Sequence, residues 1–356
     1  MVMPGSSEGR SVTDLDMYRI AVLIPCYNEK AAIGKVVADF KAAIPGATVY
    51  VYDNNSSDAT REVAARAGAI VRTEPRQGKG NVVRRMFSDI EADVYILVDG
   101  DDTYDATAAP SLTFRLIDDG LDMVNAARQT DSKRAYRAGH RFGNWILTGL
   151  VARIFGNQFT DMLSGYRVFS RRYVKSFPAL SKGFEIETEL TVHALELAMP
   201  TSEINTRYGD RHTGSVSKLR TVRDGIRILT TILLLVRDER PFAFFGFVAL
   251  VLAVTSIAVG APVVVDYLQT GLVPRLPTAV LATGFMLLSF LSFVCGLILG
   301  TVTLGRREAK RMRYLAIPGV SGTTIARLSG QHRASQASEI PKAVGGGTGE
   351  SSEIRL

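Results

Sequence analysis

The sequence predicts an α/β fold built on a mostly parallel sheet with helices on both faces, followed by an amphipathic surface helix and two transmembrane helices. Two patterns support this expectation. In residues 1–130, short apolar, β-branched runs alternate with helical stretches, which is typical of a parallel sheet. Further on, residues 242–265 and 276–305 carry no charged side chain, and a helix of about 20 apolar residues is long enough to span a bilayer.

Strands and helices are expected to alternate along the first part of the chain. The apolar runs predict strands at 19–25, 48–53, 69–73, 94–99 and 122–126. Helical patterns cover 30–43, 56–68, 79–91 and 107–119. The helix at 56–68 begins with Ser and Asp, which cap helix N-termini, and ends on Gly68, a residue type common just after a helix.

Three polar loops follow strands of the predicted sheet: PCYNE (25–29), DNNSSD (53–58) and DGDD (99–102). In such sheets ligands bind at the carboxyl ends of the strands, where the chain leaves for the next helix. Each loop alone has a simpler interpretation as loop punctuation with a helix cap. Their coincidence at one edge of the sheet favours a binding site.

Four aspartates gather at the end of the strand 94–99, at positions 99, 101, 102 and 105. Desolvating crowded like charges is costly, so this turn is either solvated or holds a cation. Asp99 and Asp101, separated by Gly100, offer two hard oxygen ligands on one tight turn, which suits Mg²⁺ or Mn²⁺. The turn lacks the glycine that a calcium-binding loop requires.

The same turn fits a second pattern. Asp99, Asp101 and Thr103 form D-x-D-x-T, which resembles the nucleophile loop of haloacid-dehalogenase-type phosphatases. That motif normally follows the first strand of its fold, whereas two strand–helix units precede it in this chain. The phosphatase is therefore a remote alternative.

A glycine-rich loop and an aspartate, both following strands, suit an anionic ligand that contains a nucleoside. RQGKGN (76–81) places Lys79 between glycines at a helix N-terminus, which favours an anion, although the spacing is not that of a P-loop. Asp53, at the end of its strand, could accept hydrogen bonds from a nucleobase or a ribose.

Taken in order, the loops resemble the GT-A catalytic domain of family 2 glycosyltransferases. The stretches that carry the resemblance are PCYNE, DNNSSDAT, GKGNVVRRMF and the DGD of LVDGDD. Later stretches narrow it to the polyprenyl-phosphate glycosyltransferases, the group of dolichol-phosphate mannose synthase and the bacterial two-span undecaprenyl-phosphate glucosyltransferases. These are FTDMLSGYRVFSRR (159–172), GFEIETEL (183–190) and RHTGSVSKL (211–219). The resemblance covers about residues 18–310 and implies a Rossmann-like GT-A domain.

The resemblance implies roles for residues on the donor side. Asp99 and Asp101 would bind the divalent metal, Mg²⁺ or Mn²⁺, that holds the donor diphosphate. Arg211 and Lys218 would steady the phosphates from a mobile loop, in addition to Lys79 at its helix N-terminus. The residues that would line the base and ribose pocket are Pro25, Tyr27, Glu29 and Asp53.

On the acceptor side, Arg128 and Arg141 match arginines that receive the lipid phosphate, and Asp161 would lie close to the sugar. The candidate catalytic residues are thus Asp99, Asp101, Asp161 and Arg128. The acceptor phosphate is largely ionised near neutral pH, because its second pKa is about 6, and it needs no general base. Neither Asp161 nor Glu187 is therefore assigned as a base; each could instead cap a helix or pair with Arg167 and its neighbours.

Two departures from the family pattern leave details open. Mannose synthases usually carry a glutamine four residues beyond the first D-x-D aspartate, and Thr103 stands there, so water or Asp102 would complete the metal shell. The second loop reads DNNSSD where DDGSxD is common, which leaves the base preference open. The sugar, the nucleotide, the prenyl length and the downstream glycan pathway are not fixed by the sequence.

Charged flanks predict how the apolar stretches lie in a membrane. Residues 211–240 carry seven Arg or Lys against three acids, and 306–313 carry five against one, whereas 266–275 carry only Asp266 and Arg275. By the positive-inside rule, both long ends lie on the cytoplasmic side of an inner membrane. The net charge of +7 lies mainly in these basic flanks. A basic belt could bind nucleic acid, but its position beside two spans favours anionic lipid headgroups as the partner.

Five segments are expected along the chain. They are a flexible N-terminus (1–17), a cytosolic glycosyltransferase domain (18–220), an amphipathic juxtamembrane helix (221–241), two transmembrane helices in 242–305 (about 242–265 and 278–303), and a basic, then disordered, cytosolic tail (306–356). Family members are often tetramers through their membrane helices, so the resemblance implies a homo-oligomer.

The expected activity is inverting transfer of a single sugar from a nucleotide-sugar donor, a UDP-sugar or GDP-mannose, to polyprenyl (undecaprenyl) phosphate at the cytoplasmic membrane face. An alternative is a processive polysaccharide synthase of the same superfamily. Such enzymes normally carry a Q-x-x-R-W motif and more spans, and the single tryptophan, Trp145, lies in no such motif. A non-catalytic scaffold would be expected to lose phosphate-handling residues that this chain keeps: Asp99, Asp101, Arg211 and Lys218.

Overall fold

The structure, a computed structural model, describes residues 11–129, 149, 159–181, 183, 185–209, 234, 237, 238 and 240–320. A short 3₁₀ helix, η1 (Val12–Met17), lies where we expected a flexible N-terminus. Ser11 caps this helix and Leu15 is buried in the core, which explains the difference. The amphipathic helix expected at 221–241 lies largely outside the described residues, as does all of the tail beyond 320.

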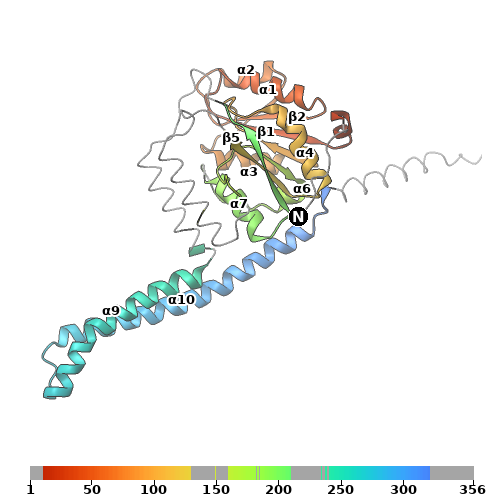
Figure 1. The fold of residues 1–356 in the computed structure, drawn as a ribbon. Coiled ribbons are helices and arrows are strands. Elements are labelled where there is room, and N and C mark those ends of the chain that lie inside the picture. The colour runs from red at the N-terminus through yellow and green to blue at the C-terminus, as the bar shows by residue number, and fades with distance from the viewer. Residues whose placement is uncertain are drawn as a thin grey trace, which may run out of the picture.

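A seven-stranded sheet lies at the centre of the globular part (Figure 1), in the order β3-β2-β1-β4-β6-β5-β7. The strands are β1 (Ile20–Cys26), β2 (Thr48–Asp53), β3 (Ile70–Thr73), β4 (Val94–Leu97), β5 (Met123–Gln129), β6 (Arg167–Ser170) and β7 (Thr201–Arg207). Neighbouring strands are parallel except that β6 is antiparallel to both β4 and β5. The prediction of a mostly parallel sheet is confirmed, whereas β6 and β7 were not among the predicted strands.

Helices cover both faces of the sheet, as predicted. They are α1 (Ile33–Ala43), α2 (Thr60–Arg66), α3 (Lys79–Asp89), η2 (Ala106–Ala108), α4 (Ala109–Asp118), α6 (Arg171–Ser176) and α7 (Ile186–Glu196). Successive residues of a strand point to opposite faces. In β1, Val22 and Ile24 accordingly pack into the core beneath α1 and α4, and Ala21 and Leu23 into the core beneath α3, α6 and α7.

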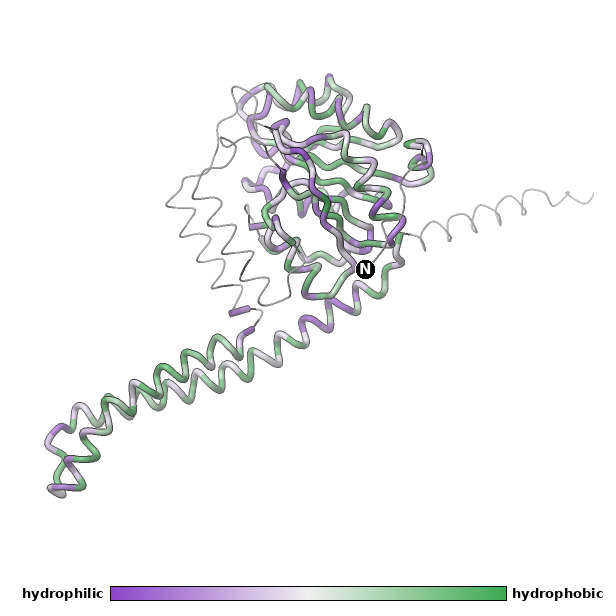
Figure 2. Tube along the Cα trace, viewed as in Figure 1, coloured by the Kyte–Doolittle hydropathy of each residue, from purple (hydrophilic) through white to green (hydrophobic). Residues whose placement is uncertain are grey.

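Two long apolar helices follow the globular part, α9 (Pro241–Thr270) and α10 (Leu276–Leu315). Both are long and apolar enough to cross a membrane. They pack along each other, where Ser256 Oγ donates to the Ala282 carbonyl (2.7 Å) and Ser289 Oγ to the Ala249 carbonyl (2.7 Å). Figure 2 shows the apolar pair extending away from the sheet. The two expected spans are therefore present as helices.

The second helix, α10, continues past residue 305, where we expected the span to end, as far as Leu315. Its last turns lie against the globular part. Lys310 Nζ and Arg307 Nε lie 2.6 and 3.5 Å from the carboxylate of Glu196 at the end of α7, and Tyr314 is buried. Part of the basic stretch 306–313, which we had assigned to lipid headgroups, thus pairs within the chain.

His193 of α7 gives the fold a pH dependence. It is buried against Tyr173 and Phe177, and this burial, together with the charge of Lys310, lowers its pKa to about 3. Below the unfolded pKa of about 6.5 the unfolded chain binds a proton that the folded chain does not, so stability falls as the pH falls. We expect the melting temperature in detergent to drop between about pH 6.5 and about pH 4, and to drop less in His193→Phe. An equal pH slope in both proteins would contradict this assignment.

Candidate active site

The loops after β1 and β2 are joined by hydrogen bonds. Asn28 adopts the left-handed conformation (φ 54°), which asparagine tolerates better than most residues. Its Oδ1 accepts from the Ser57 N–H (2.8 Å), and its own N–H donates to Ser56 Oγ (2.8 Å). The Glu29 N–H donates to Thr60 Oγ1 (2.9 Å), and α2 begins at Thr60 rather than at the predicted residue 56. The loops PCYNE and DNNSSD are therefore held together by hydrogen bonds at the edge of the sheet.

Asn54 fastens the end of β2 to the glycine loop that precedes α3. Its amide nitrogen donates to the carbonyls of Glu74 (2.9 Å) and Arg76 (2.8 Å), and its Oδ1 accepts from the Gly78 N–H (2.7 Å). Gly78 has a φ of 127°, which favours glycine, and it precedes Lys79, the first residue of α3. An amide that uses both donors and its acceptor in this way fixes the loop and hence the start of α3.

The residues predicted to line a base and ribose pocket are brought to this edge. Pro25 in β1 pairs with Tyr52 in β2, and the next pair in the register is Cys26 with Asp53. The Asp53 side chain is fully buried, accepts from the Ser56 N–H (3.2 Å) and lies 3.9 Å from Arg61 Nε. Tyr27, which follows Cys26 in the chain, is 37% exposed. The Asp53 carboxylate thus already accepts a hydrogen bond within its own turn. Its role in binding a nucleoside stays a prediction.

Asp99 and Asp101 lie at the end of β4 in different surroundings. Asp99 is 31% exposed, and its Oδ1 contacts the Lys79 ammonium at 2.5 Å. Asp101 is buried, and its Oδ1 accepts from Thr103 Oγ1 (2.6 Å). Thr103, which stands where the related mannose synthases have glutamine, therefore orients one of the predicted metal ligands.

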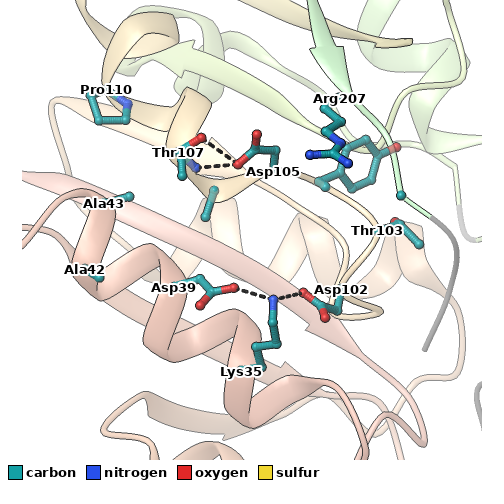
Figure 3. A pocket seen from close by; sticks show the side chains of 13 residues that line it. Lys35, Asp39, Ala42, Ala43, Asp102, Thr103, Asp105, Thr107, Pro110 and Arg207 are labelled. Carbon is teal, nitrogen blue, oxygen red and sulfur yellow. Dashed lines mark hydrogen bonds and ion pairs between the residues drawn. The ribbon is translucent and has the colours of Figure 1, made fainter. Parts of the chain in front are cut away.

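The other two aspartates of the turn line a cavity of about 610 Å³ between α1 and the loop before α4 (Figure 3). Asp102, with a φ of 59°, pairs with Lys35 of α1 at 2.8 Å. Asp105 accepts from the Thr107 N–H (2.9 Å) and caps η2. Asp102, which we considered as a further metal ligand, is thus engaged by Lys35.

Lys79 joins Asp99 to a residue far along the chain, Glu187 in the first turn of α7. The Lys79 ammonium is buried and lies 2.6 Å from Glu187 Oε1 as well as 2.5 Å from Asp99. Burial alone would lower the pKa of Lys79, but the charges of the two carboxylates raise it above its ordinary value. Burial raises the pKa of Glu187, and Lys79 opposes that rise. Lys79 is therefore a fixed cation, and no local sequence pattern indicated Glu187 as its partner.

Arg128 and Asp161, both predicted to act near the sugar and the lipid phosphate, form one ion pair. Arg128 lies near the end of β5 and donates from Nε (2.7 Å) and Nη2 (2.8 Å) to the two oxygens of Asp161. Burial would raise the pKa of Asp161, but the hydrogen bonds and charge of Arg128 lower it overall. The pair is rigid, since two parallel bonds fix the plane of the guanidinium.

Arg167 makes no direct hydrogen bond or ion pair with Asp161 or Glu187, so a direct bond to Arg167 is the part of the structural alternative that is wrong. The two acids pair with Arg128 and Lys79 instead. Arg167 is fully buried and donates to the carbonyls of Ser164 (3.0 Å) and Met162 (2.6 Å) and to Thr191 Oγ1 (2.8 Å). These bonds replace water around a buried guanidinium and hold the loop before β6 in place. Arg167 is thus a structural support for the loop that carries Asp161.

Gly165, in the same loop, leaves room for Asp99. A Cβ on this residue would lie 2.3 Å from Asp99 Oδ2. Its N–H donates to the hydroxyl of Tyr104 (2.8 Å). The SGY stretch was part of the resemblance, but the reason for its glycine, the close approach of the D-x-D carboxylate, is visible only in three dimensions.

Three predicted site residues, Arg141, Arg211 and Lys218, lie outside the described residues. Gly209, two residues before Arg211 in the sequence, lies beside the D-x-D turn. The Gly209 N–H donates to the Thr103 carbonyl at 2.8 Å. Gly209 itself therefore lies at the predicted metal-binding turn.

Asp99 and Asp101 suit a divalent cation that takes its other ligands from a substrate. Among the residues that the structure describes, no three His, Cys, Asp or Glu side chains are grouped to hold a metal. Two carboxylates on one turn, the first 31% exposed, fit Mg²⁺ or Mn²⁺ completed by phosphate oxygens and water. They do not fit a metal enclosed by protein ligands alone.

Comparison of the sequence with known proteins finds similarity over the part of the chain that carries most of this site. Residues 21–177 match the family described as glycosyl transferase family 2. The chain is 36% identical over 250 residues to the glycosyltransferase AglJ of Haloferax volcanii, across 70% of this chain and 81% of AglJ. It is 27% identical over 229 residues to a dolichyl-phosphate hexose transferase of the same organism, across 64% of this chain and 99% of that protein.

Comparison with solved structures supports the predicted GT-A fold. A structure of glucosyl-3-phosphoglycerate synthase from Mycobacterium tuberculosis, in complex with Mn²⁺, UDP and glucosyl-3-phosphoglycerate, matches with a TM-score of 0.53 and 20% identity. The match covers 65% of this chain and 85% of that one. At this identity the likeness concerns the fold alone, and the predicted GT-A-like sheet is confirmed.

The contact between Gly165 and Asp99 can be tested by stability. In Gly165→Ala the new methyl group displaces the Asp99 carboxylate and separates it from Lys79, which we expect to cost about 2 kcal/mol and to lower the melting temperature by several degrees. Gly209→Ala is the matched control, because its Cβ would lie 3.8 Å from the nearest atom. In an Asp99→Ala background the Gly165→Ala substitution should cost little. Equal stability of Gly165→Ala and the original protein would contradict the contact.

Proposed function

Because this chain belongs to glycosyl transferase family 2, we propose that it transfers a single sugar, with inversion, from a nucleotide-sugar donor to polyprenyl phosphate at the cytoplasmic face of a membrane. The observation that carries the proposal is the turn of Asp99 and Asp101 beside the Lys79 cation, in a chain that continues into two apolar helices. A soluble donor and a membrane-borne acceptor could meet at such a site. A relative named a dolichyl-phosphate hexose transferase supports this acceptor class.

On the donor side, Asp99 and Asp101 would hold Mg²⁺ or Mn²⁺. The metal would neutralise the donor diphosphate and stabilise it as a leaving group. Lys79 stays charged between the carboxylates of Asp99 and Glu187, and its charge adds to the positive field at the start of α3. The residues proposed to hold the base and ribose are Pro25, Tyr27, Glu29 and Asp53. Arg211 and Lys218 are proposed to close over the phosphates.

On the acceptor side, Arg128 and Arg141 are proposed to bind the lipid phosphate. Asp161 holds the Arg128 guanidinium through Nε and Nη2, which sets the direction from which a phosphate approaches. The phosphate oxygen is already ionised near neutral pH, so the protein has only to align it behind the anomeric carbon and offset the combined negative charge. One displacement then inverts the anomeric centre, and an α-linked donor gives a β-linked product.

The membrane arrangement follows the charge pattern of the sequence. α9 and α10 would span the membrane with both long ends in the cytoplasm, and the stretch 221–241 would lie on its surface. A homo-oligomer through the spans is part of the proposal. Gly260 and Gly296 are used within the chain, against Ala282 and Phe245, whereas a Cβ on Gly246 would meet nothing within 4 Å.

The two other enzyme classes have less support. The D-x-D-x-T turn follows β4 rather than the first strand, and the family is one of transferases rather than phosphatases. A processive synthase belongs to the same superfamily but needs a channel. Two helices of sufficient length occur among the described residues, and two helices cannot by themselves enclose a pore.

The direct test is a transfer assay with purified protein in detergent. Undecaprenyl phosphate, Mg²⁺ or Mn²⁺ and a panel of UDP-, GDP- and dTDP-sugars are incubated together, and lipid-linked sugar is detected by mass spectrometry. We expect product from one donor, dependent on the metal and reduced at least about 100-fold in Asp101→Asn, since removing a group that stabilises transition-state charge costs this much.

The matched control is Asp118→Asn, at the end of α4 and away from the site. Its activity should equal that of the original protein. Hydrolysis of a simple phosphomonoester without transfer from any donor would overturn the proposal in favour of the phosphatase.

A further inference from the structure

The last turns of α10 contact the globular part through one face of the helix. Arg307, Lys310 and Tyr314 follow at intervals of three and four residues, which places them side by side. Figure 1 shows α10 as one helix that runs from the apolar pair to the sheet domain. A single rigid element therefore belongs both to the proposed membrane anchor and to this interface.

The first contact is with Glu196, the last residue of α7. Its side chain is 3% exposed and lies 2.6 Å from Lys310 Nζ and 3.5 Å from Arg307 Nε. A carboxylate is unfavourable at a helix C-terminus, where the macrodipole is negative, and burial adds to the cost. The two cations from α10 compensate a charge that α7 cannot stabilise by itself.

The second contact is with Asp122, the residue before β5. Tyr314 Oη donates to Asp122 Oδ2 at 2.6 Å, and Arg172 donates to both carboxylate oxygens at 3.0 and 2.7 Å. The Arg172 guanidinium also lies over the Tyr314 ring, 4.4 Å from its centroid. Ser170 Oγ adds a bond of 2.7 Å to Asp122 Oδ1. A buried network that is satisfied in this way is specific and stiff.

Both contacts lie at the far ends of elements that carry the candidate site. α7 has Glu187 in its first turn and Glu196 at its end, and its 11 residues span about 16 Å. β5 begins one residue after Asp122, carries Arg128 near its end, and spans about 23 Å over 7 residues. A helix and a strand inside a packed domain move as rigid bodies, so the position of α10 is linked to that of the site.

We propose that residues 306–315 of α10 form a strut that fixes the height and orientation of the site above the membrane, with Lys310 and Tyr314 as positioning residues for the acceptor. This inference rests on the proposed function. A polyprenyl phosphate presents its phosphate only at the level of the headgroups, whereas the nucleotide sugar arrives from solution. Loosening the strut therefore impairs the encounter with the acceptor and leaves the donor side unchanged.

The test uses the full chain in lipid nanodiscs and two acceptors, undecaprenyl phosphate in the bilayer and a short-chain prenyl phosphate that stays in solution. In Arg307→Gln/Lys310→Gln and in Tyr314→Phe, we expect the KM for undecaprenyl phosphate to rise about 10-fold. The KM for the donor and the kcat with the soluble acceptor should stay within about twofold of the original values.

Two variants separate positioning from other effects. Lys310→Arg keeps the ion pair with Glu196 and should behave like the original protein. Arg313→Gln removes an exposed charge from the same segment and should have no effect. Equal losses with both acceptors would indicate a merely structural role and overturn the proposal, as would the absence of any loss.

A distance measurement tests the strut without any transfer. Spin labels are placed at Ser111 on α4 and Gln269 on α9, both exposed, with Cys295 replaced by Ser. We expect a narrow distance distribution that broadens in Arg307→Gln/Lys310→Gln/Tyr314→Phe. If the original protein transfers sugar to neither acceptor, the proposed function fails and this measurement alone decides about the strut. An equally narrow distribution in the triple variant would overturn it.

Discussion

The buried contact of Lys79 with Asp99 and Glu187 is the interaction on which the arrangement of the site depends. Its three members come from the start of α3, the end of β4 and the start of α7. Two carboxylates this close would repel each other without the ammonium between them, and the ammonium would be costly to bury without both. This three-residue contact therefore fixes α3, the end of β4 and α7 relative to one another, although they are far apart in the sequence. Two neighbouring residues support it. Asn54 sets the loop before Lys79, and Gly165 leaves the space that the Asp99 carboxylate occupies.

The charges of the site are distributed unevenly. The charge of Lys79 offsets one of the two neighbouring carboxylates, Asp99 and Glu187, and Asp101 adds a further negative charge after β4. The donor side therefore carries an excess of negative charge that a divalent cation would neutralise. Arg128 and Asp161 instead balance each other. The two proposed ligands would thus meet different surroundings. The donor diphosphate would be bound through the metal cation, and the lipid phosphate would be bound by an arginine whose guanidinium is held in a fixed plane.

The sequence predicted the parts of this site that local patterns encode. Strands and helices alternate locally, so the loops at 25–29, 53–58 and 99–102 could be assigned to one edge of the sheet, and the glycines around Lys79 to a helix start. The partners of the charged groups could not be predicted, because they come from distant segments. Lys79 lies 108 positions from Glu187 and Lys35 lies 67 from Asp102. The short strand β6 was missed for a similar reason, since its four buried residues are defined by their antiparallel neighbours rather than by any period of their own. The end of α10 looked like a basic membrane flank, and only the fold shows Glu196 and Asp122 opposite it.

The measurement that tests the central claim most directly is Mn²⁺ binding, followed by electron paramagnetic resonance on the full chain in detergent with and without UDP. If Asp99 and Asp101 hold a metal that a diphosphate completes, Mn²⁺ should bind tightly only when UDP is present, and Asp101→Asn should weaken that binding at least about 10-fold, as the loss of a charged ligand does. Binding of Mn²⁺ and UDP that is unchanged in both Asp99→Asn and Asp101→Asn would contradict the account.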